Sequence, residues 1–179
     1  MKQFVAFLRG INVSGQKKVP MADLRKVLSD IGFKNVQTYI QSGNLVFESN
    51  EIDPSQISVL IEKCIKKEFA FEVPVLVKAV GEIQLILNNN PFDQQDDLEQ
   101  NRVYFVLFLE SPESNLVNAF KEESYPNEQF YIGNDCLYLK CNLGYGNAKL
   151  NNNLIERKLK IIATTRNYRT LNKMLEMTS

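Results

Sequence analysis

The chain has 179 residues, of which 44% are hydrophobic, and its 21 Lys and Arg residues balance its 21 Asp and Glu residues. This apolar content supports a folded core and argues against disorder. A net charge of zero provides no overall field to attract nucleic acid or an anionic membrane, although a local basic patch stays open.

The chain contains three cysteines and no histidine. An odd number of cysteines argues against a disulfide framework. Cys64 falls on the apolar face of a predicted helix, whereas Cys136 and Cys141 lie in one predicted strand at an odd separation and so face opposite sides. Without histidine, a Cys/His metal site and a histidine-based triad are excluded, and we expect no metal and no cofactor.

The amino terminus reads MKQFVAFLRG. Its apolar run is far shorter than the roughly 20 residues of a membrane span, and it lacks the length of a signal-peptide core. We therefore expect a cytoplasmic protein with no membrane partner.

The first half of the chain alternates between strand and helix patterns. Strands are predicted at Phe4 to Leu8, Val36 to Ile40, Leu45 to Phe47 and Val73 to Val80. Helices are predicted to begin at Pro20 and at Asp53-Pro54, where a first-turn proline is tolerated. Ser42-Gly43-Asn44 predicts a hairpin turn. The order β-α-β-β-α-β is that of a ferredoxin-like plait.

A short helix at Glu82 to Leu87 and a polar stretch then interrupt this pattern. The second half repeats it, with strands at Val103 to Leu109, Phe130 to Ile132, Leu137 to Cys141 and Ile161 to Thr164. Helices are predicted after Ser111-Pro112, after the Gly144-Tyr145-Gly146 loop and from Tyr168 onward. We predict an α+β fold of two tandem ferredoxin-like (βαββαβ) plaits with extra helices. Residues 1–90 form the first half, 91–101 the linker, and 102–179 the second half with its C-terminal helix.

The first strand is apolar on both faces. Phe4, Ala6 and Leu8 share one side, and Val5 and Phe7 share the other. Strands of this kind are covered on both sides. This pattern disfavours an RNA-recognition motif, which needs an open aromatic face for stacking bases.

Four strings, in this order along the chain, carry a family resemblance. They are Leu8-Arg9-Gly10-Ile11-Asn12-Val13, Lys18-Val19-Pro20-Met21, Thr38-Tyr39-Ile40-Gln41-Ser42-Gly43-Asn44 and Ala163-Thr164-Thr165-Arg166-Asn167. Together they resemble the bacterial domain-of-unknown-function 1697 family. The resemblance implies a cytoplasmic bacterial protein with tandem ferredoxin-like halves, and it implies no activity. The chain departs from the family pattern at Ala148, where a Ser is usual, and at Tyr168, where a Trp is common.

The first candidate site joins two loops of the first half. In a split βαβ plait the first and second strands are parallel, so the segments that follow them lie at one end of the sheet. Glycines with Lys and Ser near a helix start suit an anion. The alternative is an ordinary solvated loop. The candidate ligand-binding residues here are Arg9, Asn12, Lys18, Gln41, Ser42 and Asn44.

The second candidate site is built in the same way in the second half. A glycine loop that enters a helix exposes backbone N–H groups, and the helix dipole favours an anion there. The alternative is structural, with Asn147 as a helix cap, Thr165 or Asn167 as the next cap, and Arg166 in a surface pair. The candidate residues are Gly144, Gly146, Asn147, Lys149, Thr165, Arg166 and Asn167.

These loops favour a binding protein for a phosphate-bearing ligand, either a nucleotide or nucleic acid. An enzyme acting on a small phosphorylated or anionic substrate is an alternative, but neither loop holds a carboxylate that could act as general base. A protein–protein interaction module is the other alternative. The acidic residues Asp93, Asp96, Asp97 and Glu99 predict a solvated loop rather than a metal site.

Overall fold

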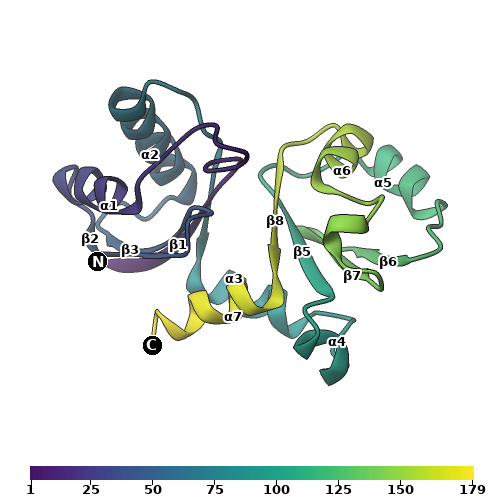
Figure 1. The fold of residues 1–179 in the computed structure, drawn as a ribbon. Coiled ribbons are helices and arrows are strands. Elements are labelled where there is room, and N and C mark those ends of the chain that lie inside the picture. Colours follow the sequence, from purple (N-terminus) through teal and green to yellow (C-terminus); the bar gives the residue numbers. More distant parts are fainter. The chain divides into compact units, whose positions relative to one another are not determined.

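The computed structural model describes residues 1–179 and divides into two compact units (Figure 1). One unit contains residues 1–84 and 173–179, and the other contains residues 85–172. The chain forms two four-stranded antiparallel sheets and seven α-helices, which confirms the predicted α+β class. None of these helices combines the length and apolar character needed to cross a membrane.

The first unit begins with β1, α1, β2, β3, α2 and β4 in that order. Their bounds are Lys2–Leu8, Met21–Asp30, Lys34–Tyr39, Asn44–Ser49, Pro54–Phe69 and Val75–Ala79. The strands lie in the order β2-β3-β1-β4. Because β3 is antiparallel to both β1 and β2, those two strands run parallel and finish at the same end of the sheet.

Helices α1 and α2 cover one face of this sheet (Figure 1). The core between them includes the stacked rings of Phe33 and Phe47, whose centroids are 4.7 Å apart. The Asp53 side chain accepts the Ser55 amide at the start of α2, as expected of a cap. Val5, on the opposite face of β1, is also fully buried, as the two-sided apolar pattern predicted.

The second unit contains the other sheet and most of the remaining helices. The elements that lie wholly within it are α4 Gln95–Glu99, β5 Val103–Phe108, α5 Ser114–Lys121, β6 Glu128–Ile132, β7 Cys136–Cys141, the 3-10 turn η1 Tyr145–Asn147, α6 Asn152–Leu159 and β8 Ala163–Asn167. The chain passes from one unit to the other within α3, Val80–Asn88, and again within α7, Tyr168–Glu176. The strand order is β6-β7-β5-β8, which leaves β6 and β8 as edges.

The stretch 91–101, predicted as a linker, is instead part of the second unit. It contains α4, and the carboxylate of Asp97 is buried there. That carboxylate pairs with Lys140 of β7 at 2.5 Å and with Arg102 at 3.5 Å. A charge can be buried only with such partners, and the predicted polar loop gave no sign of them. Residues 173–179, predicted in the second half, group with the first unit.

All three cysteines are free. Cys136 and Cys141 are both buried, and Cys141 belongs to the core on the helix-covered face of the second sheet. Cys64 is half-buried in α2, packed against the first core. These positions agree with the predicted faces of the strand and the helix.

Candidate functional site

Two loops meet at the end of the first sheet where β1 and β2 finish. The Leu8 amide donates to the Gly43 carbonyl at 2.8 Å, and the Arg9 amide donates to the Pro74 carbonyl at 3.0 Å. The residues that follow β1 therefore lie beside the turn between β2 and β3 and beside the start of β4. We call residues 9–18 the cationic loop, because they include Arg9 and two lysines and no acidic residue.

Asn12 fastens the cationic loop to its surroundings. Its side-chain amide donates to the Gln41 carbonyl at 2.7 Å and to the Val19 carbonyl at 3.0 Å, and its side-chain oxygen accepts the Val19 amide at 2.9 Å. The residue adopts a left-handed φ of 55°, which asparagine tolerates better than most residues. All three bonds are internal, so the contribution of Asn12 to the site is to position the loop.

The turn between β2 and β3 is held tightly against the loop. Asn44 is fully buried, and its side-chain amide donates to the Tyr39 carbonyl at 3.0 Å and to the Ser42 hydroxyl at 2.9 Å. Asn44 is therefore a structural residue rather than a surface ligand. The Gln41 side chain is exposed and Ser42 is half-buried, so these two predicted residues can face a ligand.

The backbone of the cationic loop is left-handed at Gly10, Asn12, Ser14, Gly15 and Lys17. Ser14 and Gly15, which are both left-handed, form the centre of a tight turn that the Gln16 amide closes by donating to the Val13 carbonyl at 2.9 Å. The amides of Ser14 and Gly15 donate no hydrogen bond within the chain. Lys18 is exposed, and the Lys17 ammonium donates to the Glu72 carbonyl at 2.7 Å. The loop thus combines cationic side chains with open amides.

In the second unit, the glycine loop packs against β8 through a tyrosine. The Tyr145 hydroxyl accepts the Asn152 amide at 2.9 Å and donates to the Thr165 hydroxyl at 3.4 Å. The Thr165 hydroxyl donates in turn to the Asn152 side-chain oxygen at 2.8 Å. The Tyr145 ring stacks on Tyr104 of β5 at 4.8 Å. The predicted neighbourhood of the glycine loop and Thr165 is therefore present.

The donors at this loop are already used by the protein itself. The Lys149 amide donates to a carboxylate oxygen of Glu128 at 3.3 Å. At the start of α6, the Asn151 side chain accepts the Leu154 amide at 2.9 Å. The Asn147 side-chain amide donates to the Leu143 carbonyl at 3.1 Å, and Asn147 lies in η1 rather than at the cap of α6. An incoming anion finds few open amides here.

The prediction that Arg166 lies beside the glycine loop is wrong. Side chains alternate along a strand, so Arg166 lies on the opposite face of β8 from Thr165. It is 9% exposed, and its guanidinium donates to the Thr164 hydroxyl at 2.8 Å and to the Thr165 carbonyl at 2.9 Å. Burial lowers the pKa of the Arg166 guanidinium to about 10. Arg166 is a buried structural cation.

Asn167, the last residue predicted for this site, caps α7. Its side-chain oxygen accepts the Thr170 amide at 2.8 Å, so of the two caps that the structural alternative offered, Thr165 or Asn167, the second is present. The glycines at 144 and 146 leave open space where a Cβ would lie, so neither is needed for a close backbone approach. Residues 144–149 and Thr165 lie close together, whereas Arg166 is buried on the opposite face of β8 and Asn167 caps α7.

Glu128 was not among the predicted site residues. It is buried in β6 beside Cys141, and its second carboxylate oxygen has no hydrogen-bond partner. The alternation Glu128, Phe130, Ile132 along a strand could have placed this carboxylate on the buried face. No group of three or more Cys, Asp or Glu side chains is arranged to hold a metal ion.

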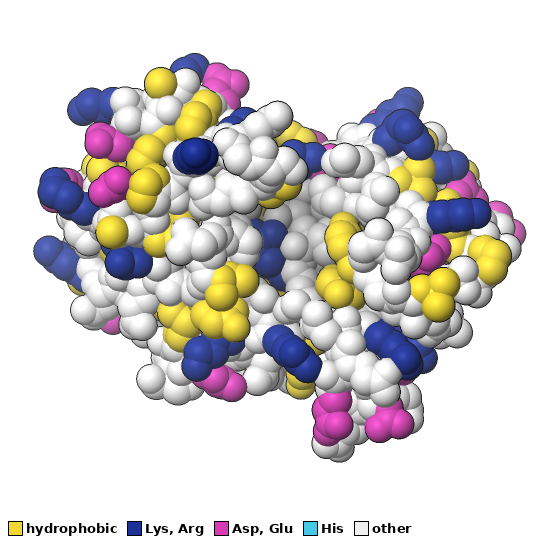
Figure 2. All heavy atoms as spheres, viewed as in Figure 1, with side chains coloured by type: hydrophobic (Ala, Val, Ile, Leu, Met, Phe, Trp, Pro, Cys, Tyr) yellow, Lys and Arg dark blue, Asp and Glu magenta, His cyan; other side chains and the backbone are white.

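Acidic and basic side chains are interspersed over the visible face, in keeping with the balanced charge (Figure 2). Basic side chains therefore cluster only locally. The cationic loop is one such cluster, and its segment contains no acidic residue.

Three comparisons place the chain among known proteins. It is similar in structure to the conserved bacterial protein SP0830 from Streptococcus pneumoniae, with a TM-score of 0.75 and 23% sequence identity, over 99% of this chain and 98% of that one. None of the curated proteins compared with the chain matches it. The family model described as "Protein of unknown function (DUF1697)" matches residues 1–138. The chain therefore belongs to the DUF1697 family.

Proposed function

We propose that the chain binds a phosphate-bearing ligand, a nucleotide or a nucleic acid, through the cationic loop of the first unit. The observation that carries the proposal is the combination of Arg9, Lys17 and Lys18 with an open, partly left-handed backbone at one end of a sheet. Cationic side chains and exposed amides are the donors that phosphate oxygens accept most strongly.

The first-unit loop has better support than the glycine loop of the second unit. The glycine loop donates to Glu128, an internal carboxylate, and Arg166 faces elsewhere. An enzymatic role has less support, because the cationic loop contains neither a carboxylate nor a thiol that could transfer a proton or attack a substrate.

The test is a titration of the full chain with inorganic phosphate, followed by NMR. We expect the Ser14 and Gly15 amide signals to shift, because these amides are open in the free protein. Lys18→Ala should weaken the affinity about threefold to tenfold, the range for an exposed charge pair or somewhat more. Lys34→Ala is the matched control, since Lys34 is exposed at the opposite end of the same sheet. Amides that stay unmoved at tens of millimolar phosphate would contradict the proposal.

A second titration separates the two ligand classes. Short single-stranded DNA and a nucleoside triphosphate are compared at several salt concentrations. Binding of nucleic acid should fall steeply as salt rises, because each neutralised phosphate releases counterions. Binding of a single nucleotide should change less. Equal affinity of Lys18→Ala and the unmodified chain for both probes would place the site elsewhere.

We also propose that each unit is a ferredoxin-like plait. The order β-α-β-β-α-β and the strand order β2-β3-β1-β4 in the first unit support this assignment, and β6-β7-β5-β8 repeats it in the second. Three free cysteines support a cytoplasmic location, where thiols stay reduced.

A further inference from the structure

Strand β6 leaves one backbone edge of the second sheet open. Next to this strand, the Asn142 amide donates to the Asn127 carbonyl at 2.9 Å, and the Gly133 amide donates to the Cys136 carbonyl at 2.9 Å. Hydrogen-bonded positions alternate along an antiparallel pair. The odd-numbered residues of β6 therefore bond to β7, and the even-numbered residues direct their N–H and C=O groups away from the sheet.

Part of this edge is covered by the chain itself. The Glu128 amide donates to the Tyr125 carbonyl at 3.4 Å, in an isolated bridge that closes the first position of the strand. Phe130 and Ile132 are the next even-numbered residues, so their backbone groups also point away from β7. The bridge between Tyr125 and Glu128 does not extend to them. Their outward N–H and C=O groups form a short open edge, which is the backbone arrangement to which an added strand pairs.

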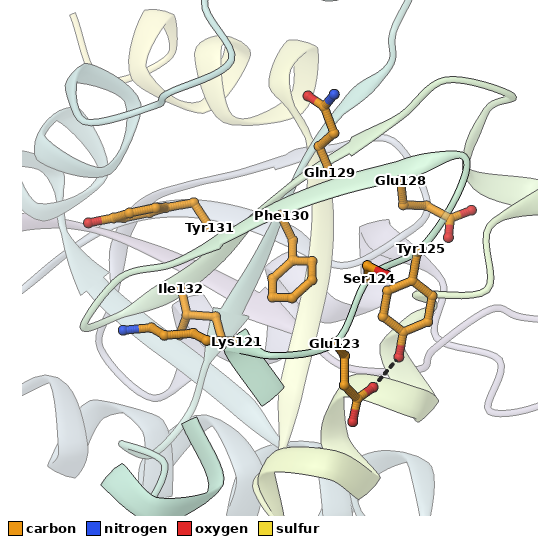
Figure 3. A pocket seen from close by; sticks show the side chains of 9 residues that line it. All are labelled: Lys121, Glu123, Ser124, Tyr125, Glu128, Gln129, Phe130, Tyr131 and Ile132. Atoms are coloured by element: carbon orange, nitrogen blue, oxygen red, sulfur yellow. Dashed lines mark hydrogen bonds between the residues drawn. The ribbon is translucent and has the colours of Figure 1, made fainter. Parts of the chain in front are cut away.

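A cavity of about 500 Å³ lies along this open edge (Figure 3). Phe130 lines it, stacked on Phe120 at 5.0 Å, and Lys121 and residues 123–125 also line it. A second cavity, of about 360 Å³, continues beside α5 and shares Lys121 and Ile132 with the first. The two cavities make one groove, which we call the β6 groove. Both cavities are largely open to solvent, so the groove can receive an extended segment laid along it.

One lysine and two carboxylates, Glu123 and Glu128, line the larger cavity, whereas the smaller cavity is lined by the same lysine, Lys121, and by no carboxylate. The Glu123 carboxylate accepts the Tyr125 hydroxyl at 2.5 Å (Figure 3). It also pairs with Lys158 at 2.7 Å, so its charge is compensated. Lys121 lines both cavities, and no hydrogen bond or ion pair within the chain engages its ammonium. An occupant that carries a carboxylate would complement this position.

We propose that the β6 groove binds an extended peptide segment with an acidic side chain. The peptide backbone pairs with Phe130 and Ile132, one side chain enters the larger cavity, and the carboxylate meets Lys121. Tyr131, which is 58% exposed on the other face of β6, offers an aromatic surface to the alternate side chain. A second copy of this chain fits less well, because the carboxylate of its own β6 strand, Glu128, is buried.

The test begins with selection of a displayed random heptapeptide library on the full chain. The recovered peptides should alternate β-branched residues and include at least one Asp or Glu. When such a peptide is synthesised and added, the amide signals of Phe130 and Ile132 should shift and their hydrogen exchange should slow, because these amides gain acceptors. The Gln129 and Tyr131 amides already pair with β7 and should be protected before and after binding.

Charge reversal provides the decisive variant. Lys121→Glu should weaken the binding of acidic peptides by about fivefold or more, as expected for an exposed charge contact. Selection on this variant should instead recover peptides that contain Lys or Arg. Lys160→Glu is the control, since Lys160 is an exposed lysine of the same unit that does not line the groove. Recovery of no peptide above an unrelated protein, or peptides that shift only amides elsewhere, would overturn the proposal. Phe130 and Ile132 signals that shift with protein concentration alone would also overturn it, in favour of a second copy.

Discussion

Gly43→Ala is expected to destabilise the first unit more than the substitution of any other glycine at the same end of the sheet. Gly43 has a left-handed φ of 78°, and its carbonyl accepts the Leu8 amide. A Cβ at this position would lie 2.6 Å from the Leu8 Cβ and 2.9 Å from the terminal methyl of Ile11. Both neighbours are buried, so neither can swing into solvent.

The expected decrease in the free energy of unfolding has two parts. A non-glycine residue in the left-handed region costs about 1–2 kcal/mol. Forcing an extra methyl group into a packed core costs about 1–3 kcal/mol more. The sum, about 2–5 kcal/mol, is a large share of the roughly 5–15 kcal/mol that stabilises a typical domain.

Gly15→Ala separates the two parts. Gly15 has a similar φ of 75°, but no atom lies within 4 Å of the position that its Cβ would take. Its substitution should cost only the backbone term, about 1–2 kcal/mol. Urea unfolding is followed through the amide signals of β1 and β3, because two units can unfold in separate steps. Equal losses for the two variants would mean that the turn does not approach Leu8, and the geometry of the candidate site would be wrong.

Three further predictions follow from buried polar groups and thiols. Asn12→Gly keeps the left-handed backbone but removes three hydrogen bonds, and it should lower the free energy of unfolding by about 1–3 kcal/mol in urea. The hydrogen bond from Lys140 lowers the pKa of Asp97. The stability that this pair contributes is therefore present above the ordinary pKa of an aspartate and is lost as the pH falls through the lowered pKa. Asp97→Asn should reduce this loss of stability at acid pH, as measured by unfolding between pH 6 and 2. Burial raises the pKa of Cys141 to about 12, so iodoacetamide at pH 8 should modify Cys64 well before Cys141, as mass spectrometry can show; faster labelling of Cys141 would contradict its burial.

Local patterns in the sequence determined most of the secondary structure. The two-sided apolar run at Phe4 to Leu8 predicted a strand buried on both faces, and Asp53-Pro54 predicted the start of α2. These signals work because the period of side chains and the chemistry of caps are set within a few residues of chain. They also located the loops at the end of the first sheet, because the connection order of a split βαβ unit dictates which strands run parallel.

The tertiary structure decided what the polar residues of those loops do. Arg166 and Thr165 are neighbours in the sequence, yet strand alternation buries the guanidinium on one face and sends the hydroxyl to the glycine loop on the other. Asp97 is buried because Lys140, which is distant in the sequence, supplies the opposite charge. Whether a polar side chain binds a ligand or fastens the fold depends on such distant partners, and no local pattern encodes them.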